Sequence, residues 1–290
     1  MYYFLSLLTG VLISVMIVLN GGLTAQHGVY SATVIVHISG LLLIAALVLF
    51  KRERPFAQRQ AWFLYLGGAI GVLTTVFNNV AFGRISVSAI LALGLFGQSV
   101  TGLVIDQYGL LGMSKHPLAA RKLIGLALIL GGIAAMINYL DFELVAILFS
   151  FAAGFCVVIS RTLNAKLADR TSVRSSTFFN YLVGLGVSIP FLLLLGRGEA
   201  PLPFAFSPSW YIYLGGILGV CVVLLSNMTV ARISAFYLTL LIFVGQVFSG
   251  VLIDAVLTGS LSPRTLIGGL LVAGGLCVNL FLDKKKLAAT

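Results

Sequence analysis

Ten long stretches of low charge divide the chain, and this pattern constrains the fold more than any other feature. A membrane-spanning helix needs about 20 mainly apolar residues, and all ten stretches have a suitable length. Lipid forces backbone groups to bond internally, which leaves helices or barrel strands, and the absence of period-2 alternation excludes a barrel. We expect an all-α polytopic membrane protein with ten transmembrane helices. The stretches cover roughly residues 3–26, 28–50, 61–83, 85–105, 123–140, 144–160, 175–196, 208–231, 233–253 and 265–282.

Composition and charge agree with a membrane protein. Hydrophobic residues make up 60% of the chain and charged residues 9%, against about 25% charged residues in soluble domains. The formal net charge of +10 could indicate nucleic-acid binding, but the basic residues lie between the apolar stretches. We therefore expect no nucleic-acid partner.

The distribution of Lys and Arg predicts the orientation. With the N-terminus in the cytoplasm, 15 of the 18 basic residues fall on the cytoplasmic side, as the positive-inside rule requires. Both termini are then cytoplasmic. The cytoplasmic set is Lys51, Arg52, Arg54, Arg59, Lys115, Arg121, Lys122, Arg161, Lys166, Arg170, Arg174, Arg232, Lys284, Lys285 and Lys286, and the other side keeps Arg84, Arg197 and Arg264.

The chain contains an internal repeat. Residues Gly97–Asp106 read GQSVTGLVID, and residues Gly245–Asp254 read GQVFSGVLID. Between 79–106 and 227–254, ten of 28 positions are identical at a fixed offset. Matches in Asn, Arg, Gln and Asp in the same order indicate duplication rather than chance similarity between apolar helices.

Other matches extend the repeat over the chain and divide it into residues 1–141 and 142–290. Each half carries five apolar stretches, an odd number, so the second half enters the membrane in the opposite orientation. The loops agree with this inversion: the loop after the second stretch holds four basic residues, whereas its counterpart in the second half holds only Arg197. We therefore expect two inverted five-helix repeats in one integrated membrane domain, an arrangement found in secondary transporters. The further matches pair Leu19-Asn20 with Leu163-Asn164, Gly40 with Gly184, Trp62 with Trp210 and Gly67-Gly68 with Gly215-Gly216.

Within the repeated segment, the helices of the fourth and ninth stretches each place a Gln, a Gly and an Asp on one stripe, and also an Arg if the helix already includes it. Because these helices would run antiparallel, Arg84 and Asp254 share the outer face, and Arg232 and Asp106 share the inner face. The pairs are either gating latches or static packing contacts, and the sequence leaves both open. Small residues favour close helix approach, which predicts packing positions at Gly97, Gly102, Gly245 and Gly250.

Polar side chains inside the other stretches form the candidate binding set. In the first half they fall toward the outer third of the membrane and in the second half toward the inner third. They either line two vestibules or join helices by hydrogen bonds. His37 is either a proton carrier or a hydrogen-bonded packing residue. With the two repeated glutamines, the set is Asn20, His37, Asn78, Asn79, Gln98, Asn164, Asn180, Tyr181, Asn227 and Gln246.

No enzyme constellation is visible in the sequence. There is no convergent Ser-His-Asp set, no metal-ligand spacing and no phosphate-binding loop for ATP. The three cysteines, Cys156, Cys221 and Cys277, all fall inside apolar stretches. We expect neither catalysis, nor a metal, nor a cofactor.

The pattern Gly97-Gln98, Ile105-Asp106, Gly109, Gly112, Pro117 and Gly125, together with Asn20-x-x-Leu23, resembles the YdcZ-type family of inner-membrane exporters in the drug/metabolite transporter superfamily. The second half departs from it after Asp254, where Ala255–Ser260 lacks the paired glycines. The resemblance covers both halves, as a fused ten-helix form. It implies a bacterial cytoplasmic membrane and alternating access, but no substrate.

The function favoured by these observations is a secondary transporter, an exporter of an unidentified small molecule. The alternatives are a non-transporting membrane assembly or regulatory module, and a channel. The expected partners are the lipid bilayer and the transported molecule, with the chain acting as a monomer or a homodimer.

Overall fold

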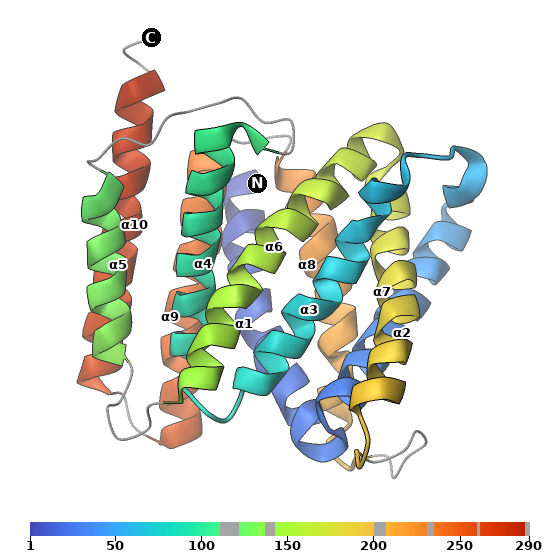
Figure 1. Cartoon of the computed structure of the whole chain (residues 1–290), viewed down its shortest axis with the longest axis horizontal. Coiled ribbons are helices and arrows are strands. Elements are labelled where there is room, and N and C mark those ends of the chain that lie inside the picture. The colour runs from blue at the N-terminus through green and yellow to red at the C-terminus, as the bar shows by residue number, and fades with distance from the viewer. Residues whose placement is uncertain (111–121, 137–142, 200–206, 231–234, 260–261, 288–290) are drawn as a thin grey trace.

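The computed structural model describes residues 1–110, 122–136, 143–199, 207–230, 235–259 and 262–287, and in these ranges the chain is all-helical. Beyond an isolated bridge between Phe82 and Ile85, the described residues form no β-structure. The beginning of α1 and the end of α10 lie on the same side of the bundle (Figure 1). The ten helices are α1 (Tyr2–His27), α2 (Val29–Phe50), α3 (Leu66–Ala81), α4 (Val87–Tyr108), α5 (Lys122–Met136), α6 (Leu144–Arg170), α7 (Val173–Leu195), α8 (Gly215–Val230), α9 (Ala235–Thr258) and α10 (Pro263–Leu287).

Three short 3₁₀ segments complete the described elements. They are η1 (Pro55–Ala57), η2 (Trp62–Tyr65) and η5 (Trp210–Leu214), and the last two lead directly into α3 and α8. Among the described residues, eight elements are long and apolar enough to cross a membrane, namely α1, α2, η2 with α3, α4, α6, α7, η5 with α8, and α9. The structure therefore agrees with a polytopic membrane protein.

Local sequence explains several helix ends. Gly28 separates α1 from α2 with a φ of 89°, a conformation that glycine adopts without steric cost. Ser86 caps α4 by accepting a hydrogen bond from the amide of Ala89, and Ser172 caps α7 through the amide of Ser175. Gly109 ends α4 in the left-handed conformation, as is common at helix C-termini.

Helix α6 extends ten residues beyond the end expected from the sequence. It continues to Arg170 because residues 161–170 contain no Gly or Pro and because Leu163 and Leu167 are buried against Leu64 and Phe179. The prediction that Arg161 lies in a cytoplasmic loop is therefore wrong: Arg161 lies inside a helix.

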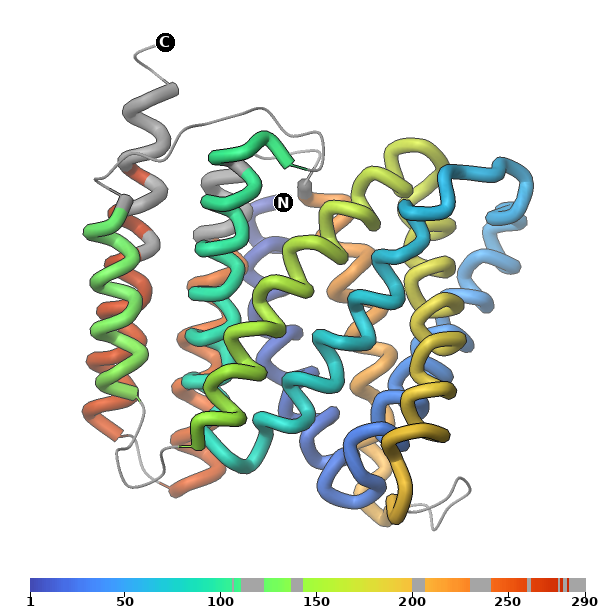
Figure 2. The backbone as a smooth tube through the Cα atoms, viewed as in Figure 1, coloured from blue at the N-terminus to red at the C-terminus, as the bar shows by residue number. Residues whose placement is uncertain are grey.

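Packing in the bundle follows a repeated pattern. Helix α1 packs against α8 and α9, while α6 packs against α3 and α4. Helix α2 pairs with α7, and α4 contacts α9. Helices α5 and α10 pack mainly against each other and form a pair beside the remaining eight (Figure 2).

Glycines permit close crossings of α4 with α6 and of α9 with α1. A Cβ on Gly97 of α4 would lie 3.1 Å from the Cα of Gly154 and would strike the carbonyl oxygen of Phe151. On α9, a Cβ on Gly245 would lie 3.1 Å from the Cα of Gly10 and would strike the carbonyl oxygen of Leu7. Backbones of α4 and α6, and of α9 and α1, therefore meet without intervening side chains.

The remaining two predicted packing glycines differ. Gly250 faces Ser88 and Leu91, so it lies at the contact of α9 with α4. Gly102 has no described atom within 4 Å of its Cβ position, so the prediction that it packs at this contact finds no support there.

Carboxylates connect α2 and α7 at both ends of this helix pair. At the start of α7, Glu53 accepts hydrogen bonds from Ser172 and Ser175 and forms an ion pair with Arg174. At the start of α2, Glu199 accepts hydrogen bonds from the amides of Tyr30 and Ser31 at 3.0 and 2.8 Å. Each loop that follows one helix therefore caps the other, and negative charge is favourable at a helix N-terminus.

Replacing Glu53 with Gln should lower stability at neutral pH by up to about 1 kcal/mol. Burial alone raises the pKa of the Glu53 carboxyl, but its bonds to Ser172, Arg174 and Ser175 outweigh this, so its pKa lies below the ordinary 4.5. Because the pKa of Glu53 is lower in the folded state, its carboxylate stabilises the fold at pH values above the unfolded pKa. This contribution is lost as the pH falls through the folded pKa. Thermal unfolding at pH 7 and at progressively lower pH measures the difference.

The matched control is Glu143→Gln, which removes a half-exposed carboxylate that lies 3.8 Å from Arg84. It should have a smaller effect at pH 7. A difference between Glu53→Gln and wild type that does not shrink in acid would contradict this interpretation of the cap.

The expected ion pair between Arg84 and Asp254 is absent. Asp254 instead accepts hydrogen bonds from the amides of Val87 and Ser88, at 2.8 and 2.9 Å, while Arg84 approaches Glu143. The physical reason is that the free amides in the first turn of α4 donate directly to the Asp254 carboxylate, whereas Arg84 is half-exposed and turns toward Glu143. The second expected pair lies outside the description, because Arg232 and the side chain of Asp106 are not among the described residues.

Candidate functional site

A cavity of about 200 Å³ lies where eight of the helices converge. Residues of α1, α2, α3, α4, α6, α7, α8 and α9 line it, and the described residues of α5 and α10 do not. Its wall combines apolar side chains such as Ile13 and Val222 with many amide and hydroxyl groups. This combination is typical of a small-molecule site, in which a few polar groups orient the ligand.

Nine of the ten polar residues singled out in the sequence line this one cavity. They are Asn20, His37, Asn78, Gln98, Asn164, Asn180, Tyr181, Asn227 and Gln246. The tenth, Asn79, does not line the cavity: it is buried, with its Nδ2 3.4 Å from Thr33 Oγ1. Asn79 lies about 100° around α3 from Asn78, on the side where it meets Thr33 of α2.

One group of polar residues is already satisfied within the protein. Asn164 donates to Asn180 Oδ1 at 2.8 Å, and Ser160 donates to the carbonyl of Gly67 at 2.7 Å. These contacts join α6 to α7 and to α3. They are the helix-joining bonds that the sequence left as one of two interpretations.

His37 and Tyr181 face each other, with ring centroids 5.8 Å apart. The Nδ1 of His37 lies 2.7 Å from the carbonyl oxygen of Thr33, so Nδ1 carries the hydrogen, because a carbonyl only accepts. Tyr181 donates to the carbonyl of Gly216. The His37 ring packs over Gly184 and the Tyr181 ring packs over Gly40, and a Cβ at either glycine would overlap the ring. In this structure His37 is thus a hydrogen-bonded packing residue on the cavity wall.

A second group of cavity-lining polar atoms is buried without a hydrogen-bond partner. They are Asn20 Oδ1, Thr74 Oγ1, Asn227 Nδ2 and Gln246 Oε1. A buried polar group without a partner costs free energy, so these atoms need either water or a polar ligand in the cavity.

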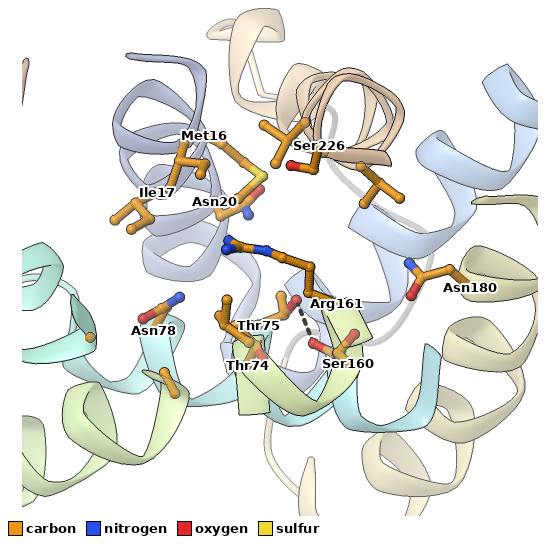
Figure 3. Close-up of a pocket in the computed structure, with 18 of the residues that line it drawn as sticks. Met16, Ile17, Asn20, Thr74, Thr75, Asn78, Ser160, Arg161, Asn180 and Ser226 are labelled. Carbon is orange, nitrogen blue, oxygen red and sulfur yellow. Dashed lines mark hydrogen bonds between the residues drawn. The ribbon is translucent and has the colours of Figure 1, made fainter. Parts of the chain in front are cut away.

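Arg161 is the functional candidate that sequence reasoning missed. It lines the cavity, and Figure 3 shows its side chain extending from α6 across the cavity toward Asn20, with Asn78, Thr74 and Thr75 beneath. The available signal was its position one residue past the expected end of the sixth stretch, three residues before the repeated Asn164. Asn164 matches Asn20, which lies inside the first stretch. This match indicates that the sixth helix continues through Arg161 to Asn164.

Comparisons with known proteins agree with this architecture. A family model described as "Putative inner membrane exporter, YdcZ" matches residues 1–135 and 145–278. A solved structure titled "Crystal structure of protein" is 16% identical, covers 98% of this chain and 96% of its own, and superposes with a TM-score of 0.64, which indicates a shared fold. No curated protein matches the chain. The two family matches together span nearly the whole sequence, and the chain therefore belongs to the YdcZ family of inner-membrane exporters.

Proposed function

We propose that the chain is a secondary transporter that exports a small molecule by alternating access between two inverted five-helix halves. The observation that carries this proposal is the central cavity, whose polar lining comes from both halves of the chain. Substrate sites of inverted-repeat transporters lie near the membrane midplane between the repeats. The proposed halves are residues 1–141 and 142–290, with both termini in the cytoplasm.

Equivalent contacts support the inverted arrangement. Gly10 on α1 approaches Gly245 on α9, while Gly154 on α6 approaches Gly97 on α4. Asn20 contacts Gly215, and Asn164 contacts Gly67. Each of these contacts between the halves thus has a counterpart at the matching sequence position. The two successive matches to one family model support duplication as well.

Accessibility of the cavity from each membrane face tests the mechanism without knowledge of the substrate. With Cys156, Cys221 and Cys277 replaced by Ala, single cysteines are introduced at Thr75 and Ser226, which line the cavity from α3 and α8. A membrane-impermeant maleimide should label each of them from either side of oriented vesicles. Ser150, buried outside the cavity lining, is the matched control and should remain unlabelled as cysteine.

The outcomes separate the candidate functions. Labelling from one face only, under all conditions, would contradict alternating access and would favour a non-transporting module. Labelling from both faces accompanied by single-channel currents in planar bilayers would indicate a channel instead.

A further inference from the structure

Arg161 is the one permanently charged side chain among the described residues that line the cavity. It forms no hydrogen bond or ion pair with any described residue. Figure 3 shows its guanidinium group among the residues that line the cavity, on the side of Asn20. An ionised side chain within a membrane bundle is costly unless it faces a partner or a wet cavity, and it marks a functional site.

Acidic residues of the described part of the chain do not neutralise Arg161. Glu53 and Glu199 cap α7 and α2. Glu143 and Asp254 are engaged by Arg84 and by the amides that begin α4, and Asp169 is exposed near the end of α6. The described cavity therefore carries one net positive charge without a protein counter-charge.

The surrounding polar atoms indicate further properties of the missing partner. Thr74 Oγ1 and Asn227 Nδ2 can donate hydrogen bonds, while Asn20 Oδ1 and Gln246 Oε1 can accept them, and all four are buried without partners. A ligand that satisfies them must carry both acceptors and donors. A cavity of about 200 Å³ restricts it to a small metabolite, since drug-sized ligands occupy sites of about 300–1,000 Å³.

The charge comes from one half of the repeat only. Because Leu19-Asn20 matches Leu163-Asn164, the position equivalent to Arg161 is Ile17, which also lines the cavity. One cation can neutralise one negative charge. A guanidinium group pairs with a carboxylate through two parallel hydrogen bonds, whereas a phosphate monoester or a dicarboxylate would leave an unbalanced negative charge.

From these observations we propose that Arg161 forms the anion-binding part of the cavity and that the substrate is a small hydroxylated monocarboxylate. The claim that this ligand is transported rests on the proposed function, whereas the claim that it binds at Arg161 does not. The carboxylate pairs with Arg161, and the hydroxyl groups donate to Asn20 and Gln246. Neutral polyols and organic cations lack the group that the guanidinium requires.

Ligand-induced thermal stabilisation of the purified protein tests this inference. The probes are lactate and gluconate, with succinate, glycerol 3-phosphate, glycerol and choline as comparisons. At least one of the two hydroxylated monocarboxylates should raise the melting temperature of the wild type more than every comparison compound. Arg161→Gln should weaken binding by about tenfold or more, because a charge-assisted interaction is lost, and Arg161→Lys should retain part of the affinity.

Two controls keep the experiment decisive. Arg170→Gln removes an exposed cation from the same helix and should leave carboxylate binding unchanged. Without ligand, Arg161→Gln should melt at or above the wild-type temperature, because it removes an intramembrane charge that has no partner among the described residues. This separates loss of binding from loss of folding.

The inference is overturned if neither hydroxylated monocarboxylate stabilises the wild type, if the stabilisation survives Arg161→Gln, or if a comparison compound stabilises the wild type equally. Binding without labelling from both membrane faces would support the anion site and contradict the transport mechanism. Labelling from both faces without anion binding would do the reverse.

Discussion

Replacing Gly97 with Ala should lower the stability of the protein by about 1–3 kcal/mol, the range typical of overpacked interiors. The added methyl group would meet the carbonyl oxygen of Phe151 and the Cα of Gly154. Both are backbone atoms of α6 and cannot rotate away as a flexible side chain could, so α4 and α6 must separate. The melting temperature of the purified protein, measured by differential scanning fluorimetry, checks this prediction.

The matched control is Gly94→Ala, one turn earlier on the same helix. Its methyl group would lie 3.7 Å from the carbonyl oxygen of Ser150, an ordinary van der Waals distance. Both variants gain the same helical preference of Ala over Gly, about 0.5–1 kcal/mol, so their difference isolates the contact with α6. Gly97→Ala melting as high as Gly94→Ala would show that the two helices do not meet closely. Gly245→Ala, at the crossing of α9 with α1, should resemble Gly97→Ala.

The second large effect is expected for Asp254→Asn, which should favour opening of the bundle at the face where α4 begins. Asp254 connects the end of α9 to the first amides of α4. Loss of an acidic or polar cap costs about 0.5–2 kcal/mol, and a two-state equilibrium near balance then shifts several-fold. Asn retains one acceptor oxygen but loses the charge that the helix N-terminus favours.

Labelling rates of a cysteine at Ser226, in the background without native cysteines, measure this shift. Labelling should become faster from the face of Val87 and slower from the opposite face. Asp169→Asn is the control, because Asp169 is an exposed acid near the end of α6, and it should change neither rate. Equal changes from both faces would mean that Asp254 only stabilises the helix end.

The sequence alone determined the helical membrane architecture, because hydrophobic length and charge are local properties. Ten apolar stretches predicted ten helices in order, and the resemblance of the repeated segment led to the correct family. Nine polar residues chosen from helix interiors meet in one cavity, since polar groups in a membrane bundle avoid lipid and turn toward the protein. These inferences required no knowledge of which helices are neighbours.

Only the tertiary structure decided the partners of the charged residues. The apolar stretch ends before Arg161, and hydropathy alone assigns this residue to a loop; α6 continues because Leu163 and Leu167 are buried against η2 and α7. Asp254 bonds to the first amides of α4 rather than to Arg84, since the ends of α4 and α9 meet only in the folded bundle. The partner of a charged group or of a free amide depends on the distance between segments far apart in the chain. A helical stripe indicates on which side of its helix a residue lies, but not how close another helix comes to that side.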